Sequence, residues 1–210
     1  RNIKNHIEMR KPMYLYPLWV RLWHLANALM FLALLVTGLS LQYSSVEYTI
    51  IPFNYAVSIH NIAGIIICVG YIFYLFANRF TSNGQYYQFP IKGMMGRIIK
   101  QFRYYSYGIF KHEDAPFPVS VGRKFNPLQK ISYVFVMYIF MPIVIITGLA
   151  LLFPDILPDK ILGIGGIHIT DLLHILMGFI LSVFMIVHIY FCTIGKTPLA
   201  NFKSMINGWH

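Results

Sequence analysis

The sequence predicts an all-α integral membrane protein, a four-helix bundle in a single domain over residues 1–210. Of these residues 57% are hydrophobic and 11% are charged, and the mean hydropathy is +0.60. Soluble domains carry about 25% charged residues, so this composition indicates burial in lipid. A helix needs about 20 mostly apolar residues to cross a bilayer. Four segments qualify, namely residues 17–41, 56–77, 128–153 and 169–194.

The first apolar run follows a basic leader and is long enough to cross the bilayer. We therefore expect a first span here and not a cleaved signal peptide. Pro17 suits the first turn of a helix, where a missing N–H costs nothing. Arg21 is the one charge in the run, and its long side chain can reach the membrane surface.

Basic residues are distributed unevenly among the segments outside the spans. Five precede or open the first span, nine lie from Arg79 to Lys130, two follow the last span, and Lys160 stands alone. Because cytoplasmic segments are enriched in Lys and Arg, we expect both termini and the central loop 79–125 in the cytoplasm. The connections 42–55 and 154–168 then lie outside. The net charge of +10 reflects this topology and does not indicate nucleic-acid binding.

The central loop contains a segment with helical periodicity. Apolar residues alternate with basic ones in a spacing that fits an amphipathic helix lying in the membrane interface. The same surface could instead dock a partner protein. The apolar residues are Met94, Met95, Ile98, Ile99, Phe102 and Tyr105, and the basic ones are Lys92, Arg97, Lys100 and Arg103.

The third span begins at Asn126-Pro127, a favourable pair for a helix cap and first turn, and Pro142 is expected to kink it. The chain also shows a faint internal repeat. Thr37-Gly38-Leu39 and Thr147-Gly148-Leu149 close the first and third spans, and His60 and His174 open the second and fourth. Two related helical hairpins would explain this pattern.

Two cysteines, Cys68 and Cys192, fall in different spans. Neither belongs to a C-x-x-C or C-x-x-C-H motif. The sequence therefore argues against covalently attached c-type haem and against a disulfide.

Histidines inside the spans give the sharpest functional signal, because ionisable residues in a membrane are costly and usually mark function. His174 and His188 are 14 residues apart, close to four helical turns, so they share one face at levels about 21 Å apart. By depth, His24 pairs with His188 near the cytoplasmic side, and His60 pairs with His174 near the outer side. Two bis-histidine sites at two depths are what two b haems require.

Three glycines fit the same arrangement. Gly64 and Gly178 follow the outer histidines by one turn, and Gly38 follows His24 by 14 residues. A porphyrin pressed against a helix needs a residue without side-chain bulk, so all three are expected to contact the outer haem. No role is expected for the histidines outside the spans, His6, His112, His168 and His210.

Other uses of intramembrane histidines remain open. The rings could hydrogen-bond between helices while the glycines allow close packing. They could also relay protons, although the spans contain almost no acidic residue, and Asp171 is the nearest. In either case the chain would be a haem-free transporter or a structural anchor.

A resemblance to a known family extends over most of the chain. The features that carry it are the four intramembrane histidines, the segment Lys124-Phe125-Asn126-Pro127-Leu128-Gln129-Lys130 and the segment Lys203–Gly208. The sequence resembles the di-haem cytochrome b subunits of membrane-bound formate dehydrogenases, Ni-Fe hydrogenases and thiosulfate reductases, which are prokaryotic cytochrome b561-like. The resemblance implies a bacterial or archaeal cytoplasmic membrane, and it implies His24, His60, His174 and His188 as haem ligands.

The resemblance also implies a function. The outer haem exchanges electrons with an iron–sulfur partner subunit, and the inner haem exchanges them with menaquinone or ubiquinone beside His188, with Asn126 and Gln129 bonding the quinone oxygens. Helix capping is the alternative role for Asn126. The chain has no molybdopterin, nickel or iron–sulfur motif, so substrate chemistry would belong to a catalytic partner subunit. A stand-alone superoxide-oxidising or ferric-reducing cytochrome would use the same haems without such partners.

Overall fold

The computed structural model describes residues 12–45, 48–88, 90–195 and 197–210. Four helical segments in these ranges are long and apolar enough to cross a membrane. They are α1 (Leu18–Tyr43), α2 (Phe53–Phe80), the continuous segment Pro127–Leu152, and α6 (Gly166–Cys192). The predicted all-α four-helix membrane fold is confirmed, and each span lies within a few residues of its expected position.

Shorter elements flank these spans. The described residues of the central loop contain the 3₁₀ helices η1 (Ser82–Tyr87) and η2 (Gly108–Lys111) and the helix α3 (Met94–Ser106). The third and fourth spans are joined through η4 (Pro154–Ile156) and a small antiparallel hairpin of β1 (Lys160–Ile161) and β2 (Ile164–Gly165). Helix α7 (Ala200–Asn207) follows the last span.

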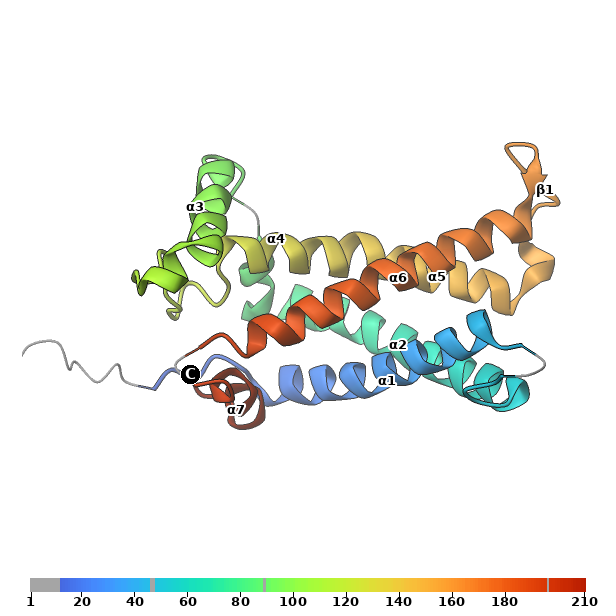
Figure 1. Cartoon of the computed structure of the whole chain (residues 1–210), viewed down its shortest axis with the longest axis horizontal. Helices are drawn as coiled ribbons and strands as arrows, with labels where there is room; N and C mark the ends of the chain where they lie inside the picture. The colour runs from blue at the N-terminus through green and yellow to red at the C-terminus, as the bar shows by residue number, and fades with distance from the viewer. Residues whose placement is uncertain (1–11, 46–47, 89, 196) are drawn as a thin grey trace, which may run out of the picture.

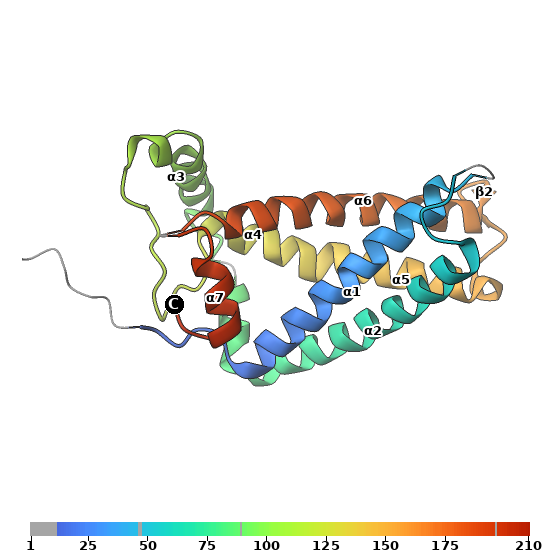
Figure 2. The same ribbon diagram turned by 60° about the horizontal axis from the view of Figure 1, so that its bottom comes forward.

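The bundle consists of two helical hairpins lying side by side (Figure 1). Helix α1 packs along α2, and α5 packs along α6, whereas contacts between the hairpins are sparser. This arrangement agrees with the faint internal repeat of the sequence. Figure 2 shows α6 and α1 approaching each other across the molecule, which brings the first and last spans together.

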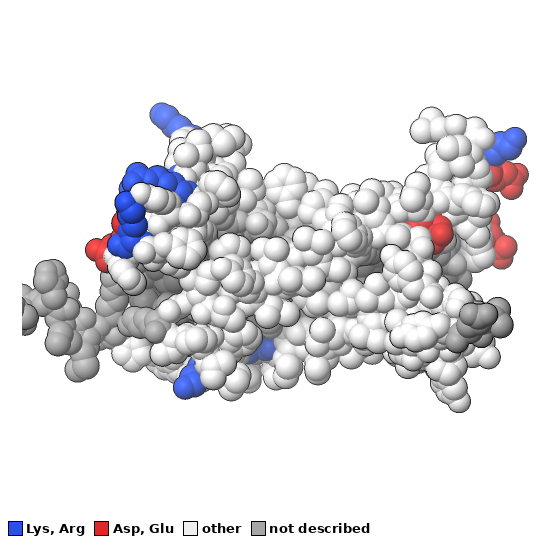
Figure 3. Space-filling view, in the orientation of Figure 1, with Lys and Arg blue, Asp and Glu red and all other residues white. Residues whose placement is uncertain are grey.

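Basic residues gather at one end of the bundle, which also carries Glu113 and Asp114 (Figure 3). Helix α3, the central loop and α7 lie at one end, and the β1–β2 hairpin lies at the other (Figure 1). Among the described basic residues, all but Lys160 belong to the α3 end by position in the chain, and Asp155, Asp159 and Asp171 belong to the other end. The basic residues Arg1, Lys4, Arg10, Lys11 and Lys196, and His6, lie outside the described ranges.

The third span is interrupted by a π-helical turn. It consists of α4 (Pro127–Phe135), the π turn η3 (Val136–Phe140) and α5 (Met141–Leu152). The Met141 N–H bonds to Val136 O, and the residue that would follow in this register is Pro142, which has no N–H. Met137 O therefore lacks a backbone donor, and the Tyr71 hydroxyl of α2 donates to it at 2.8 Å. The irregularity expected from Pro142 is thus a π turn just ahead of the proline.

Helix α3 has the expected amphipathic pattern. Met95, Ile99 and Phe102 share one exposed side. At 100° per residue, Arg97 and Lys100 fall on the other side, and Arg103 lies at the border between the two sides. Gln101 is buried between these faces. In Figure 1 the helix lies across the end of the bundle, at a steep angle to the spans.

A compact apolar layer fills the middle of the bundle. Its buried members come from α2, the third span and α6: Ile67, Tyr71, Tyr74, Val136, Met141 and Leu181. Leu181 lies midway along α6 between His174 and His188, so this layer separates the two levels at which the histidines lie. Trp23 of α1 completes the layer by stacking on Tyr74 with ring centres 4.6 Å apart.

Candidate functional site

The four intramembrane histidines form two facing pairs. The rings of His24 in α1 and His188 in α6 are centred 6.2 Å apart. The rings of His60 in α2 and His174 in α6 are also centred 6.2 Å apart. Helix α6 therefore supplies one member of each pair, and the first hairpin supplies the other. This is the pairing predicted from depth in the sequence.

The ring separation fits two imidazoles on opposite sides of one metal ion. A bond from an imidazole nitrogen to a first-row metal is about 2.0 Å long. Two such rings are then centred about 6.2 Å apart, since each nitrogen lies about 1.1 Å from its ring centre. Direct hydrogen bonding between the rings would bring them closer. Two facing imidazoles are the ligand set of low-spin b haem, which is the chemistry these residues suit. Within the described ranges, no group of three or more His, Cys, Asp or Glu side chains could hold a metal ion.

Threonine hydroxyls support both histidines of the outer pair. Thr37 Oγ1 lies 2.9 Å from His60 Nδ1, and Thr147 Oγ1 lies 3.0 Å from His174 Nδ1. His174 Nδ1 also lies 3.1 Å from the carbonyl oxygen of Val144, which can only accept. The His174 Nδ1 atom therefore carries the proton, and its Nε2 lone pair is left for a metal.

The inner pair has a different environment. Tyr133 OH lies 3.3 Å from His188 Nδ1, and Phe184 stacks on the His188 ring with centres 5.7 Å apart. Cys192 Sγ lies 3.7 Å from His188 Nε2. Both Cys68 and Cys192 are free thiols, in agreement with the expected absence of a disulfide.

Glycines border the outer pair in two ways. A Cβ at Gly38 would lie 3.5 Å from Cε1 of His60, and one at Gly148 would lie 3.0 Å from Cε1 of His174. A Cβ at Gly64 or Gly178 would meet no atom within 4 Å, so these positions leave open the space that a macrocycle requires. Gly148 was not among the predicted site residues, although the repeated Thr-Gly-Leu tripeptide marks it.

Asn126 and Gln129 form a reciprocal capping box at the start of α4. Gln129 N–H donates to Asn126 Oδ1 at 2.9 Å, and Asn126 N–H donates to Gln129 Oε1 at 3.1 Å. The capping role considered for Asn126 is therefore present. Asn126 Nδ2 remains free of the box and donates to Tyr105 OH at 2.8 Å, which ties α3 to α4.

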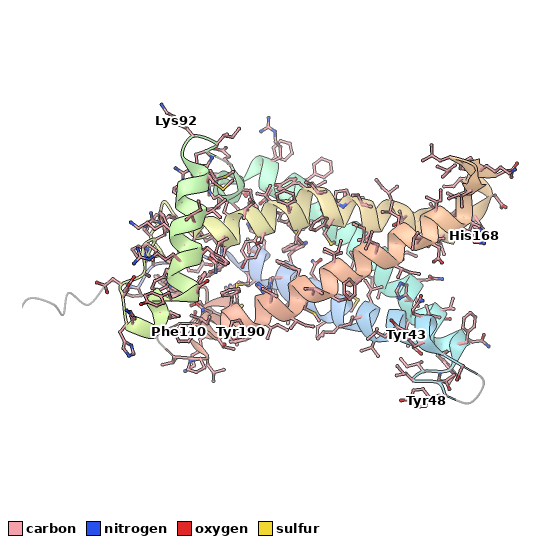
Figure 4. All side chains as sticks on the ribbon, turned by 45° about the horizontal axis from the view of Figure 1, so that its top comes forward. Tyr43, Tyr48, Lys92, Phe110, His168 and Tyr190 are labelled. Carbon is pink, nitrogen blue, oxygen red and sulfur yellow. The ribbon has the colours of Figure 1, made fainter. Side chains whose placement is uncertain are left out.

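An apolar cavity of about 340 Å³ lies beside this hydrogen bond. Residues of α3, η2, α4 and α6 line it, among them Phe102, Tyr105, Phe110, Leu128, Tyr190 and Phe191. Figure 4 shows Phe110 and Tyr190 together at the α3 end of the molecule, and His168 at the opposite end, away from this cavity. Because Tyr190 and Phe191 follow His188 along α6, the cavity is on the side of the inner pair.

Lys124 is a buried cation at the same end, with 4% of its surface exposed. Its Nζ donates to Asn83 Oδ1 at 3.2 Å and lies 4.4 Å from the centre of the Tyr16 ring. Burial lowers the pKa of Lys124 to about 8 and, as the main cause, raises the pKa of Tyr16 to about 12. The sequence alone gave no indication that this lysine is buried.

A membrane four-helix bundle that presents facing histidine pairs at two levels defines the class of membrane cytochromes b. Comparison with known proteins agrees, because the sequence profile of the prokaryotic cytochrome b561 family matches residues 15–208. The chain belongs to this family and is a cytochrome b561-type membrane haem protein. It is also 36% identical, over 207 residues, to the protein called "Putative cytochrome YdhU" of Escherichia coli (strain K12). That match covers 99% of this chain and 78% of the relative. No solved structure matches significantly.

Proposed function

We propose that this chain is the membrane-anchoring subunit of a respiratory complex that binds two b haems and transfers electrons between an iron–sulfur partner subunit and the quinone pool. The observation that carries the proposal is the presence of two histidine pairs, each centred 6.2 Å apart, at two levels of one bundle. When bound, haem supplies one-electron chemistry, and the protein contributes ligands, orientation and burial. His24 and His188 hold the inner haem, and His60 and His174 hold the outer one.

The quinone site is proposed at the cavity between α3 and α6. A quinone ring is apolar and carries two carbonyl oxygens, which need a hydrogen-bond donor. The Tyr105 hydroxyl accepts a hydrogen bond from Asn126 Nδ2, so its own proton is available to a ligand in the cavity. Asn126 then acts through Tyr105, and Gln129 acts by holding Asn126 in the capping box. Menaquinone and ubiquinone both contain a ring with two carbonyl oxygens, so both fit this proposal.

The charge distribution supports the proposed orientation. Described basic residues concentrate at the α3 end (Figure 3), which the positive-inside rule places in the cytoplasm of a bacterial or archaeal cell. The β1–β2 end then faces outward, beside the outer pair, and is where the iron–sulfur subunit would dock. Co-purification of that subunit separates this proposal from a stand-alone cytochrome that oxidises superoxide or reduces ferric iron.

The testing experiment is a reduced-minus-oxidised spectrum with pyridine haemochrome quantification of the purified protein. We expect two b haems per chain. His60→Ala should remove one haem, and His188→Ala should remove the other, with distinguishable spectra. A protein that folds and inserts but binds no haem would contradict the proposal and favour a haem-free anchor.

A further inference from the structure

Thr37 and Thr147 occupy equivalent places in the two hairpins. Each ends a span within a Thr-Gly-Leu tripeptide, and each is nearly inaccessible, with 1% and 6% of its surface exposed. Each hydroxyl approaches the carbonyl oxygen four residues earlier, Thr37 to Ala33 O at 2.7 Å and Thr147 to Ile143 O at 2.8 Å. At these separations the hydroxyl proton must lie between the two oxygens, because a carbonyl oxygen can only accept.

The direction of the bonds to the histidines follows. A hydroxyl group has one proton, and in both threonines that proton is already given to the helix. The contact of 2.9 Å between Thr37 Oγ1 and His60 Nδ1 is then a bond in which the imidazole donates. The same holds for the 3.0 Å contact of Thr147 with His174. Both outer histidines therefore present an unprotonated Nε2.

The adjoining glycines lie directly beside the rings, and only the one in the second hairpin is needed for the close approach. Gly38 and Gly148 follow the two threonines, and a Cβ at either position would touch the imidazole, at 3.5 and 3.0 Å respectively. Each outer ring thus lies against a helix backbone, with a hydroxyl on its Nδ1. Burial excludes water, so no solvent molecule replaces the hydroxyl if it is removed.

The inner pair has weaker support of this kind. The bond between Tyr133 OH and His188 Nδ1 is longer, at 3.3 Å, and no hydrogen bond of the His24 ring is found among the described residues. An imidazole that donates from Nδ1 is a more basic ligand, and a more basic ligand favours ferric over ferrous iron.

We propose that Thr37 and Thr147 are positioning residues that fix the tautomer and orientation of His60 and His174 and lower the reduction potential of the outer haem. The proposal rests on the assignment of b haem to this pair under the proposed function. Thr37 contributes more, because His174 keeps a second acceptor, Val144 O at 3.1 Å, whereas Thr37 is the one hydrogen-bond acceptor found for His60 among the described residues.

The test is a spectroelectrochemical titration of purified Thr37→Val and Thr147→Val proteins. Valine keeps the shape of threonine and removes the hydroxyl. We expect the potential of the haem that is lost in His60→Ala to rise, more in Thr37→Val than in Thr147→Val, with the other haem unchanged. A tenfold loss of preference for ferric iron in Thr37→Val corresponds to a rise of about 59 mV.

Two further sets of variants make the test decisive. Thr37→Ser and Thr147→Ser retain the hydroxyl and should keep the wild-type potential. Thr170→Val removes a buried hydroxyl of α6, the helix that carries His174; this hydroxyl bonds to Gly166 O at 2.9 Å, and its removal should leave both potentials unchanged. If the valine variants lose the outer haem, the serine variants test the role of the hydroxyl instead. Wild-type haem content and potential in the serine variants would support that role. Loss of the outer haem in the serine variants as well would overturn it.

Failure of the two proposals can be told apart. A wild-type protein without b haem would overturn the proposed function. If Thr37→Val binds two haems per chain with unchanged potentials, only the role of the threonines is overturned. The same follows if the potential shifts as much in Thr170→Val as in Thr37→Val.

Discussion

The hydroxyl of Tyr71 in α2 donates a hydrogen bond of 2.8 Å to the carbonyl oxygen of Met137, in the π turn that precedes Pro142. This bond satisfies a carbonyl that the π register and the proline leave without a backbone donor. It also joins the two hairpins between the two histidine levels. The bond thereby helps to position α5, which carries Thr147 and Gly148 to His174.

Removing this hydroxyl is expected to destabilise the bundle. Tyr71→Phe leaves a carbonyl unsatisfied in an apolar layer, which costs about 1–3 kcal/mol. The measurement is unfolding of the detergent-solubilised protein by a denaturing detergent. Tyr43→Phe, at an exposed tyrosine at the end of α1, is the matched control and should have no effect. Equal stability of the two variants would show that Met137 O finds another donor.

Two glycine substitutions are expected to differ in their effect on the outer haem. In Gly148→Ala the new Cβ would lie 3.0 Å from His174 Cε1, so the ring must move, whereas in Gly38→Ala the corresponding 3.5 Å to His60 is ordinary contact. We therefore expect Gly148→Ala to lower the content of outer haem severalfold and Gly38→Ala to retain it. Haemochrome quantification checks this, and equal haem content in both variants would contradict it.

Bulk at Gly178 should compete with haem directly. A Cβ there meets nothing within 4 Å, so a side chain can start at this position without a clash, and Gly178→Leu tests whether the space beyond is occupied. If a macrocycle occupies that space, the variant should insert normally and lose the outer haem while it keeps the inner one. Full haem content in Gly178→Leu would show that the glycine faces lipid.

Quinone turnover should depend on the hydroxyl of Tyr105. Tyr105→Phe removes one hydrogen bond of about 1 kcal/mol, which lowers quinone reduction about fivefold and leaves both haem spectra intact. Asn126→Asp keeps the cap on α4 but loses the Nδ2 donor to Tyr105, so we expect a similar loss of turnover. Asn126→Ala also removes the cap, at a further cost of about 1 kcal/mol in stability. Loss of haem in Tyr105→Phe would contradict the assignment.

The buried Lys124 makes stability depend on pH. Its pKa is about 8 in the folded protein, against 10.5 ordinarily, so the folded state loses this proton first. Between pH 8 and 10.5 the unfolded chain binds more protons, and stability rises with pH. Below pH 8 the full cost of the buried charge, about 3 kcal/mol, is present. Lys124→Met should therefore be more stable than wild type at pH 7.

The same substitution provides the measurement. Thermal unfolding of both proteins from pH 7 to pH 10 should show the advantage of Lys124→Met shrinking as pH rises. Tyr16, which faces the ammonium group, has a pKa of about 12 and stays neutral throughout this range. A difference that is constant with pH would mean that the folded and unfolded states bind the same number of protons, and that folding therefore does not lower the pKa of Lys124.

Much of this protein follows from its sequence. Four apolar segments of sufficient length require four spanning helices, because an unpaired backbone is too costly in lipid. The 14-residue spacing of His174 and His188 places both on one face of α6 by helical geometry alone. His24 and His60 could be matched to them from depth, because a membrane restricts each residue to one level. Asn126 and Pro127 predicted the cap of α4 for equally local reasons.

Tertiary structure decided the hydrogen bonds and the burial of particular side chains, because these depend on contacts between segments distant in sequence. That Thr37 and Thr147 accept from His60 and His174 depends on how closely α1 approaches α2 and α5 approaches α6. The donation by Tyr71 to Met137 O arises only where the two hairpins meet. Lys124 appears in the sequence as one more cytoplasmic charge, and only packing of Tyr16 and the central loop buries it. Helical periodicity and bilayer thickness are local constraints that a sequence displays, whereas burial and hydrogen-bond direction are set by the packed bundle.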